Sequence, residues 1–281
     1  MNAWKRLRRN KLAVVAGVVA IIAVLACILG PLLAGALGID GTTIDATLGA
    51  SPPSGAHWFG TDTLGRDMLV RVLVGGRIAL LVAFVATAIA LVIGVAYGAI
   101  SAYAGGRTDE IMMRVVDVLY GFPTLVFIIV VRAAFGWTSL VTLFALIGAI
   151  SWLTMARIVR GEVLSLRSRE FVEAARALGA SHARILFRHI VPNTLGVVII
   201  YATLSLPYVM LTEAFLSFLG LGVQAPLASL GTLVTEGSTQ IIVYPWLLVF
   251  PGAVMAIMIL SLNFLGDGLR DALDPKALPK N

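Results

Sequence analysis

Stretches without any charged residue alternate along this chain with short segments that are rich in arginine. Six of these stretches are candidate membrane spans, at residues 12–39, 78–103, 118–131, 133–156, 190–212 and 237–266. Five of them reach or exceed the roughly 20 apolar residues that a helix needs to cross a bilayer core of about 30 Å. The third has only 14 residues and does not. The pattern therefore predicts a series of membrane-spanning helices, with one segment left undecided.

The positions of lysine and arginine decide whether the third stretch crosses, because these residues collect in short loops on the cytoplasmic side. With six spans and both termini in the cytoplasm, 17 of the 21 basic residues lie on that side. Without the third span, the seven arginines from Arg157 to Arg188 would lie outside. We therefore predict six spans. Arg114 and Asp117, three apart on a helix, are expected to pair and to shorten the apparent apolar run.

Composition agrees with an all-α polytopic membrane protein. Hydrophobic residues make up 59% of the 281 residues, charged residues only 13%, and the mean hydropathy is +0.96. A pI near 9.8 would suggest nucleic-acid binding in a soluble protein, but here the membrane orientation explains the excess of basic residues. The first apolar run is too long for the core of a cleaved export signal, so we interpret it as the first span. Cys27 is the single cysteine, which excludes an internal disulfide.

A polar insert at residues 157–192 separates the fourth and fifth spans, and its pattern predicts a helix, a break and a second helix. The first helix would carry one apolar side, formed by Leu166, Phe171, Ala174, Ala175 and Leu178. Gly179 stands where a C′ glycine would end it, and Ser181 could cap the second helix. Pro192 is expected to stop that second helix.

Two interpretations of the insert are open from the residues alone. Ala174, Ala175 and Ala177 give a small-residue surface that another protein could approach closely, and Glu173 could pair with a partner's arginine. Alternatively, the insert could be an amphipathic element whose arginines rest on anionic lipid headgroups.

The order Glu-Ala-Ala, three residues, Gly and a closing Pro resembles the EAA loop of ABC-importer permease subunits. In that family the loop forms coupling helices that sit in a groove of the ATP-hydrolysing subunit. The resemblance places the loop at 161–192 and implies a coupling role for Glu173, Ala174, Ala175, Gly179 and Pro192. His189 and Val191 depart from the family's commonest pattern, which has Ile and Leu there.

Four further segments extend the resemblance over almost the whole chain. "HWFGTDTLGRD", "GGRTDEIMMRVVDVLYGFP", "EAFLSFLGLG" and "GDGLRDALDPK" look like segments of the C-type permease subunit of dipeptide, oligopeptide and nickel ABC importers. The resemblance implies a type I importer permease fold, multi-pass in the bacterial cytoplasmic (inner) membrane. It makes dipeptides or oligopeptides the expected substrates, with nickel and glutathione as alternatives.

The chain is expected to contain no nucleotide site of its own. A phosphate-binding loop needs Gly-Lys followed by Ser or Thr, and none of the four lysines follows a glycine. We therefore expect no enzyme activity and no cofactor in this chain, with ATP and magnesium bound by partner subunits. The resemblance implies a second permease subunit, two ATPase subunits and an extracytoplasmic substrate-binding protein, and we expect no nucleic-acid partner.

Glu213 is an acid within an otherwise apolar span, so it is expected either to line a pathway or to hold helices together. A proton-coupled secondary transporter is the rival class, but it would call for inverted repeats or paired midplane carboxylates. The sequence shows one midplane acid and no clear repeat.

The segment after the first span contains three candidate metal ligands, His57, Asp62 and Asp67. Their spacings match no ligand pattern, so we predict no metal site. We expect Asp62 or Thr63 to cap a short amphipathic helix, Leu64 to Val74, that leads into the second span.

These expectations divide the chain into regions. They are a basic N-terminal segment (1–11), a first span with an external loop (12–76), a core of five spans with the coupling loop (77–266) and a cytoplasmic tail (267–281).

Overall fold

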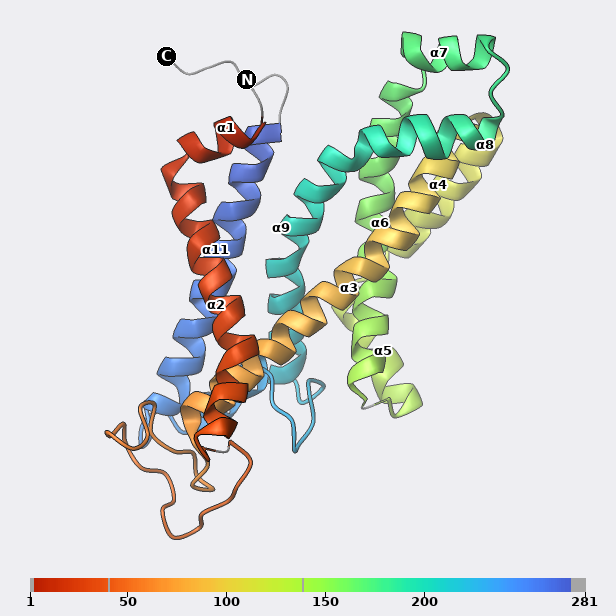
Figure 1. The fold of residues 1–281 in the computed structure, drawn as a ribbon. Coiled ribbons are helices and arrows are strands. Elements are labelled where there is room, and N and C mark those ends of the chain that lie inside the picture. Colours follow the sequence, from red (N-terminus) through yellow and green to blue (C-terminus); the bar gives the residue numbers. More distant parts are fainter. Residues whose placement is uncertain (1–2, 40, 138, 274–281) are drawn as a thin grey trace.

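The computed structural model describes residues 3–39, 41–137 and 139–273, and in these residues every regular element is a helix (Figure 1). Five helices are long and apolar enough to cross a membrane, and a bent helix pair raises the number of spans to as many as six. The five are α2 (Lys11–Ala36), α3 (Met68–Ala104), α6 (Leu140–Leu166), the stretch His182–Phe218 and α11 (Trp246–Leu273). The predicted all-α polytopic fold is confirmed.

The bent pair is the third predicted span. It consists of α4 (Gly106–Tyr120) and α5 (Thr124–Phe135), whose axes differ by 76°. Pro123 ends the first helix, because proline lacks a backbone N–H and disfavours a helical conformation at the residue before it. The ψ angle of Pro123 is 112°, outside the helical range. The short uncharged run in the sequence is thus the mark of a broken helix.

Two ion pairs join α4 to α6. Asp109 Oδ2 lies 2.6 Å from Arg160 Nη2, and Asp117 Oδ1 accepts a hydrogen bond of 2.7 Å from Arg157 Nη2. The expected pair between Arg114 and Asp117 is therefore wrong. Pairs three apart on one helix contribute only a few tenths of a kcal/mol, so a guanidinium on the facing helix competes well for the carboxylate.

The second span begins earlier than its uncharged stretch, because α3 already starts at Met68. Asp67 caps α3, accepting a hydrogen bond of 3.0 Å from the backbone N–H of Val70, and α3 then continues for 37 residues. The expected short helix over 64–74 is wrong, because Asp62 closes a turn before α3. At 1.5 Å per residue α3 is about 55 Å long, longer than the bilayer core is thick. It runs diagonally across the whole molecule (Figure 1).

Close packing of α3 on α6 organises the centre of the fold. Gly94 and Gly98, one turn apart on α3, face α6, and a Cβ added at Gly98 would lie 2.3 Å from the carbonyl oxygen of Ala156. Small residues at such spacing let membrane helices approach closely. The central apolar core of the bundle includes Met68, Ile147, Met210, Leu216 and Met258.

The two ends of the bundle differ in what they carry. Helix α1 (Ala3–Arg9), the C-terminal end of α11 and the helices α7 (Glu170–Ala177) and α8 (His182–Arg184) lie at one end (Figure 1). The segment 41–67 forms a long loop at the other end. This agrees with the predicted placement of the termini and the insert on one side, and the cytoplasmic assignment of that side stays a prediction. Residues 274–281 of the expected tail lie outside the described residues.

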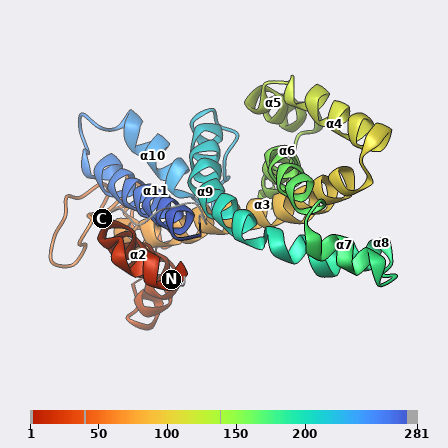
Figure 2. The same cartoon turned by 90° about the horizontal axis from the view of Figure 1, so that it is seen from above.

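The fifth span ends at a glycine-terminated turn. Helix α9 (Val191–Phe218) stops before Gly220, whose φ of +76° suits glycine. The chain then turns into the short helix α10 (Leu230–Thr239), which packs against α9 and α11 (Figure 2).

Candidate functional site

The predicted insert is a helical hairpin formed by α7, α8 and the π-helical stretch η1 (Ile185–Ile190). Gly179 has φ +78° and directly follows Leu178, the C-cap residue of α7. The N–H of Ala180 donates to the carbonyl of Ala175 over 3.1 Å. This is the C′ arrangement expected for a glycine-terminated helix. The Ser181 hydroxyl accepts from the N–H of Arg184, so the predicted cap of the second helix is confirmed.

Apolar side chains attach the hairpin to the bundle. Val172 of α7 is fully buried, and it belongs to a second core cluster that is separate from the central one. Members of this cluster include Ala99 and Ala102 of α3, Val159 and Val163 of α6, and Ile185, Leu186 and Ile190 of the hairpin's second arm. The hairpin is therefore packed against the ends of α3 and α6 and not held by a flexible linker.

The side of α7 that faces away from the bundle is the one that looked apolar in the sequence. Of the predicted apolar side of α7, only Ala175 is buried, whereas Phe171, Ala174 and Leu178 are exposed. Leu178 is 88% exposed. Val172 and Ala175 form the buried side of α7. The outer face of α7, defined by Phe171, Ala174 and Leu178 with Glu173 beside them, is exposed.

Pro192 does not stop the second arm of the hairpin. The helix runs without interruption from His182 to Phe218, and Pro192 lies in the first turn of α9. Pro192 is tolerated because the π-helical stretch η1 directly precedes α9. A π-helical turn displaces the i→i−4 bonding pattern, so a residue without an N–H can follow it without breaking the helix. The second arm and the fifth span are consequently one continuous helix, which bends between α8 and the lower part of α9 (Figure 1).

Polar contacts add to the attachment of the hairpin. Tyr103 Oη lies 3.1 Å from His182 Nδ1, and Arg167 Nη1 donates to the carbonyl of Ala102 over 2.8 Å. Both contacts join the hairpin region to the end of α3.

Glu213, the acid in the fifth span, holds segments of this chain together. Its Oε1 accepts hydrogen bonds from Ser217 Oγ (2.7 Å) and Ser229 Oγ (2.6 Å), and its side chain is 1% exposed. Ser229 is also the N-cap of α10. The interhelical alternative for Glu213 is therefore the one that the geometry supports, and a single sequence could not have named these two serines as its partners.

Comparison with known proteins identifies the family. Residues 92–278 match the family model described as binding-protein-dependent transport system inner membrane component. The chain belongs to this family. Residues 1–46 also match the N-terminal transmembrane domain of oligopeptide transport permease C.

Individual relatives agree over nearly the full length. The chain is 45% identical over 280 residues to the oligopeptide transport system permease protein OppC of Bacillus subtilis, covering 98% of this chain and 90% of that protein. It is 46% identical over 275 residues to OppC of Escherichia coli, with 98% and 90% covered. The dipeptide transport system permease protein DppC of Bacillus subtilis is 42% identical over 276 residues, with 98% and 85% covered.

The chain is therefore a membrane-spanning permease subunit of an ABC transporter complex in the bacterial inner membrane. This finding favours the permease over the secondary-transporter alternative.

At the end of the permease opposite the hairpin, buried charges fix the long loop to α3. Arg71 Nη1 lies 2.5 Å from Asp62 Oδ2, and Arg71 Nη2 lies 3.2 Å from Glu236 Oε2 on α10. Arg66 also pairs with Asp62, over 2.7 Å. Sequence reasoning missed this network, because its members are up to 165 positions apart.

The three candidate metal ligands have different tasks in the structure. His57 Nδ1 lies 2.9 Å from Asp67 Oδ2, while Asp62 is engaged by arginines. Because the Asp62 carboxylate is paired with two guanidinium groups, its role is to hold the loop and not to bind a metal ion.

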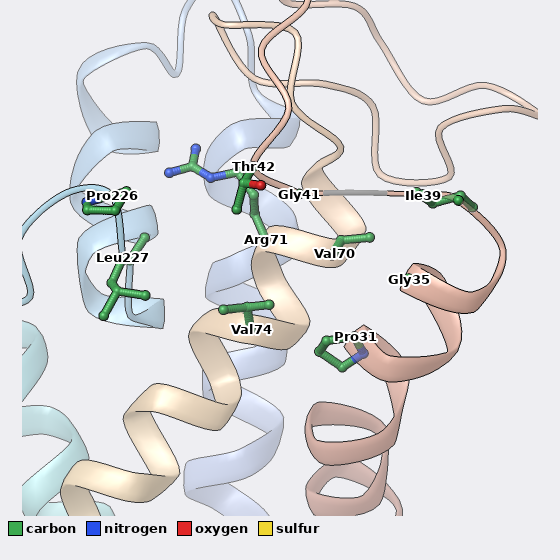
Figure 3. Close-up of a pocket in the computed structure, with 12 residues that line it drawn as sticks. Pro31, Gly35, Ile39, Gly41, Thr42, Val70, Arg71, Val74, Pro226 and Leu227 are labelled. Carbon is green, nitrogen blue, oxygen red and sulfur yellow. The ribbon is translucent and has the colours of Figure 1, made fainter.

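A pocket of about 420 Å³ lies between α2, the start of α3 and residues 226–228 (Figure 3). Pro31 and Val74 contribute to its walls, and Arg71 extends from α3 away from Pro31 (Figure 3). Because the Arg71 guanidinium is occupied by the two carboxylates, the pocket offers mainly apolar surface.

Proposed function

We propose that this permease imports dipeptides or oligopeptides and is driven through its hairpin by partner ATPase subunits. The proposal on coupling rests on one observation, the exposed outer face of α7 on a hairpin that is packed rigidly against α3 and α6. The proposal on substrate rests on the relatives, which are named for oligopeptide and dipeptide transport.

In the proposed mechanism, ATP binding closes two ATPase subunits and moves the hairpin as a rigid body. The continuous helix from His182 to Phe218 carries that movement into the fifth span. Work is transmitted only if the hairpin binds the closed ATPase dimer with a different affinity from the open one. Glu173, Ala174 and Gly179 would form the contact surface, and Ala175 and Pro192 would set its position.

The partners in this proposal are a second permease subunit, two ATPase subunits and an extracytoplasmic substrate-binding protein. ATP and Mg²⁺ would be bound by the ATPase subunits, and this chain would hold neither a cofactor nor a catalytic site. The lysine positions support that division, because none follows a glycine as a phosphate-binding loop requires. The segment 161–192 would act as the coupling unit within the core region 77–266.

Two substitutions in the hairpin test the coupling proposal, one that reverses a charge and one that changes the backbone. Glu173→Lys, or Gly179→Pro at the positive-φ glycine, should reduce substrate-stimulated ATP hydrolysis of the assembled complex to its basal rate while membrane insertion stays intact. Glu110→Lys is the matched control, since Glu110 is also exposed but lies on α4. Unchanged stimulation in the Glu173→Lys complex would refute the coupling role.

The substrate is tested separately in proteoliposomes that contain the complete transporter and its cognate binding protein. Uptake of labelled dipeptides or oligopeptides is expected. Uptake of nickel or glutathione with no uptake of either peptide class would contradict the proposed substrate and leave the coupling proposal standing.

A further inference from the structure

A second pocket, of about 430 Å³, lies between the bend of α4 and α5 and the helices α6 and α9. One wall comes from α9 and carries the side chains of Tyr201, Ser205 and Tyr208. The facing wall comes from the two sides of the bend and from α6, and includes Tyr120, Thr124 and Ser151. The pocket thus carries hydroxyl groups near the middle of α6 and α9, beside apolar residues such as Leu204, and none of its lining residues is charged.

The hydroxyl groups of this pocket need a polar partner. Tyr201, Ser205 and Tyr208 follow the i, i+4, i+7 spacing and so share one face of α9. Tyr201 is 37% exposed and Tyr208 is 56% exposed, and neither hydroxyl forms a hydrogen bond within the described part of the chain. Exposure of such groups to lipid hydrocarbon is costly, because nothing there can accept or donate a hydrogen bond.

The other hydroxyls show what kind of partner fits. Tyr120 Oη and Thr154 Oγ1 hydrogen-bond to each other over 2.7 Å. Ser205 Oγ donates to the carbonyl of Tyr201 over 2.7 Å, and Ser151 Oγ donates to the carbonyl of Ile147 over 2.8 Å. Their protons are used within their own helices, so their oxygens are left as acceptors. The two tyrosines of α9 retain both a donor and an acceptor. Together the pocket offers acceptors and donors without charge, which is the complement of an amide group.

We propose that this pocket contacts the main chain of the peptide as it crosses the membrane. This inference rests on the proposed import of peptides. Neutral hydroxyl groups can bond the N–H and C=O groups that every peptide carries, so binding is independent of the peptide's side chains. Packing against the second permease subunit is the competing use of this face. Helix interfaces in membranes prefer small residues that allow close approach, whereas two protruding tyrosine rings border this pocket.

Thiol labelling tests whether water reaches the pocket. In a Cys27→Ala background, Ser205→Cys and Tyr208→Cys in the assembled transporter should react with a charged, water-soluble thiol reagent. Peptide supplied with its binding protein and ATP should slow the reaction. Absence of reaction in every transport state, together with disulfide crosslinking to the second permease subunit, would overturn the proposal in favour of a subunit interface. This readout does not depend on transport activity.

Hydroxyl removal tests whether the contact serves transport. Tyr201→Phe/Tyr208→Phe keeps both rings and should lower the maximal peptide uptake rate about tenfold or more, as expected for two lost hydrogen bonds. The concentration of loaded binding protein needed for half-maximal uptake should not change, because binding-protein docking occurs elsewhere. Tyr244→Phe and Thr203→Ala are matched controls outside the pocket. Normal uptake by the double variant, in a transporter that imports peptides, would contradict the inference and leave the proposed function intact.

Discussion

The two ends of the permease are held in opposite ways. At the hairpin end, apolar side chains such as Val172 and Val163 pack together, and the exposed side of α7 carries Phe171 and Leu178. At the other end, the long loop is fixed by Arg71, which is 7% exposed and contacts two carboxylates.

The two kinds of contact leave different surfaces exposed at the two ends. Apolar packing is non-directional and uses one side of a helix, so the opposite side of α7 stays free to bind a partner. Ion pairs are directional and consume their charged groups, so Asp62 and Arg71 define the position of the loop and leave little for anything else to bind. The first arrangement suits a lever, and the second suits a clamp between the loop, α3 and α10.

The clamp is expected to give the largest loss of stability when it is broken. Arg71→Met leaves Asp62 with a single guanidinium partner in a buried site, and breaking a buried pair costs about 3–5 kcal/mol. Glu236→Gln is the control, because the Glu236 side chain is 51% exposed and exposed pairs contribute at most about 1 kcal/mol. Thermal unfolding of the purified complex measures both. Equal effects of the two variants would show that Arg71 is not a buried clamp.

The packing that supports the lever is expected to be somewhat less sensitive. Gly98→Ala places a methyl group 2.3 Å from the carbonyl oxygen of Ala156, and such overpacking costs about 1–3 kcal/mol. Gly161→Ala is the matched control on α6, because an added Cβ there meets nothing within 4 Å. It should be neutral or stabilising by up to about 1 kcal/mol.

The same two glycine variants distinguish stability from coupling. Gly98→Ala separates α3 from α6 and so should also reduce stimulated ATP hydrolysis, whereas Gly161→Ala should not. If both variants unfold at the temperature of the unmodified complex, then the close approach of α3 and α6 is not what positions the hairpin.

Local signals made much of this fold predictable. Hydropathy and the arginine distribution predicted the membrane-spanning helices. Gly179 and Ser181 predicted the ends of the hairpin helices. Each of these effects acts within a few residues. The bend at Pro123 was visible only as a short apolar run. The effect of Pro192 was mispredicted, because the π-helical turn that accommodates it has no comparable sequence mark.

Features that depend on distant contacts were beyond a single sequence. The partner of Arg71 on α10 and the serine partners of Glu213 are joined only by folding. The buried side of α7 could not be told from the sequence either. Apolar periodicity groups Leu178 with the other apolar residues of the insert, but it does not distinguish a side packed on this chain from a side that stays exposed.

Site-directed crosslinking tests the central claim most directly, that the hairpin is the part gripped by the ATPase. In a Cys27→Ala background, Leu178→Cys on the outer face of α7 is compared with Ile242→Cys, which is 96% exposed and follows α10. A short thiol-to-amine crosslinker is applied to the assembled transporter. The account predicts that Leu178→Cys captures an ATPase subunit and that Ile242→Cys does not. Capture of the ATPase at position 242, or none at position 178 in any nucleotide state, would contradict it.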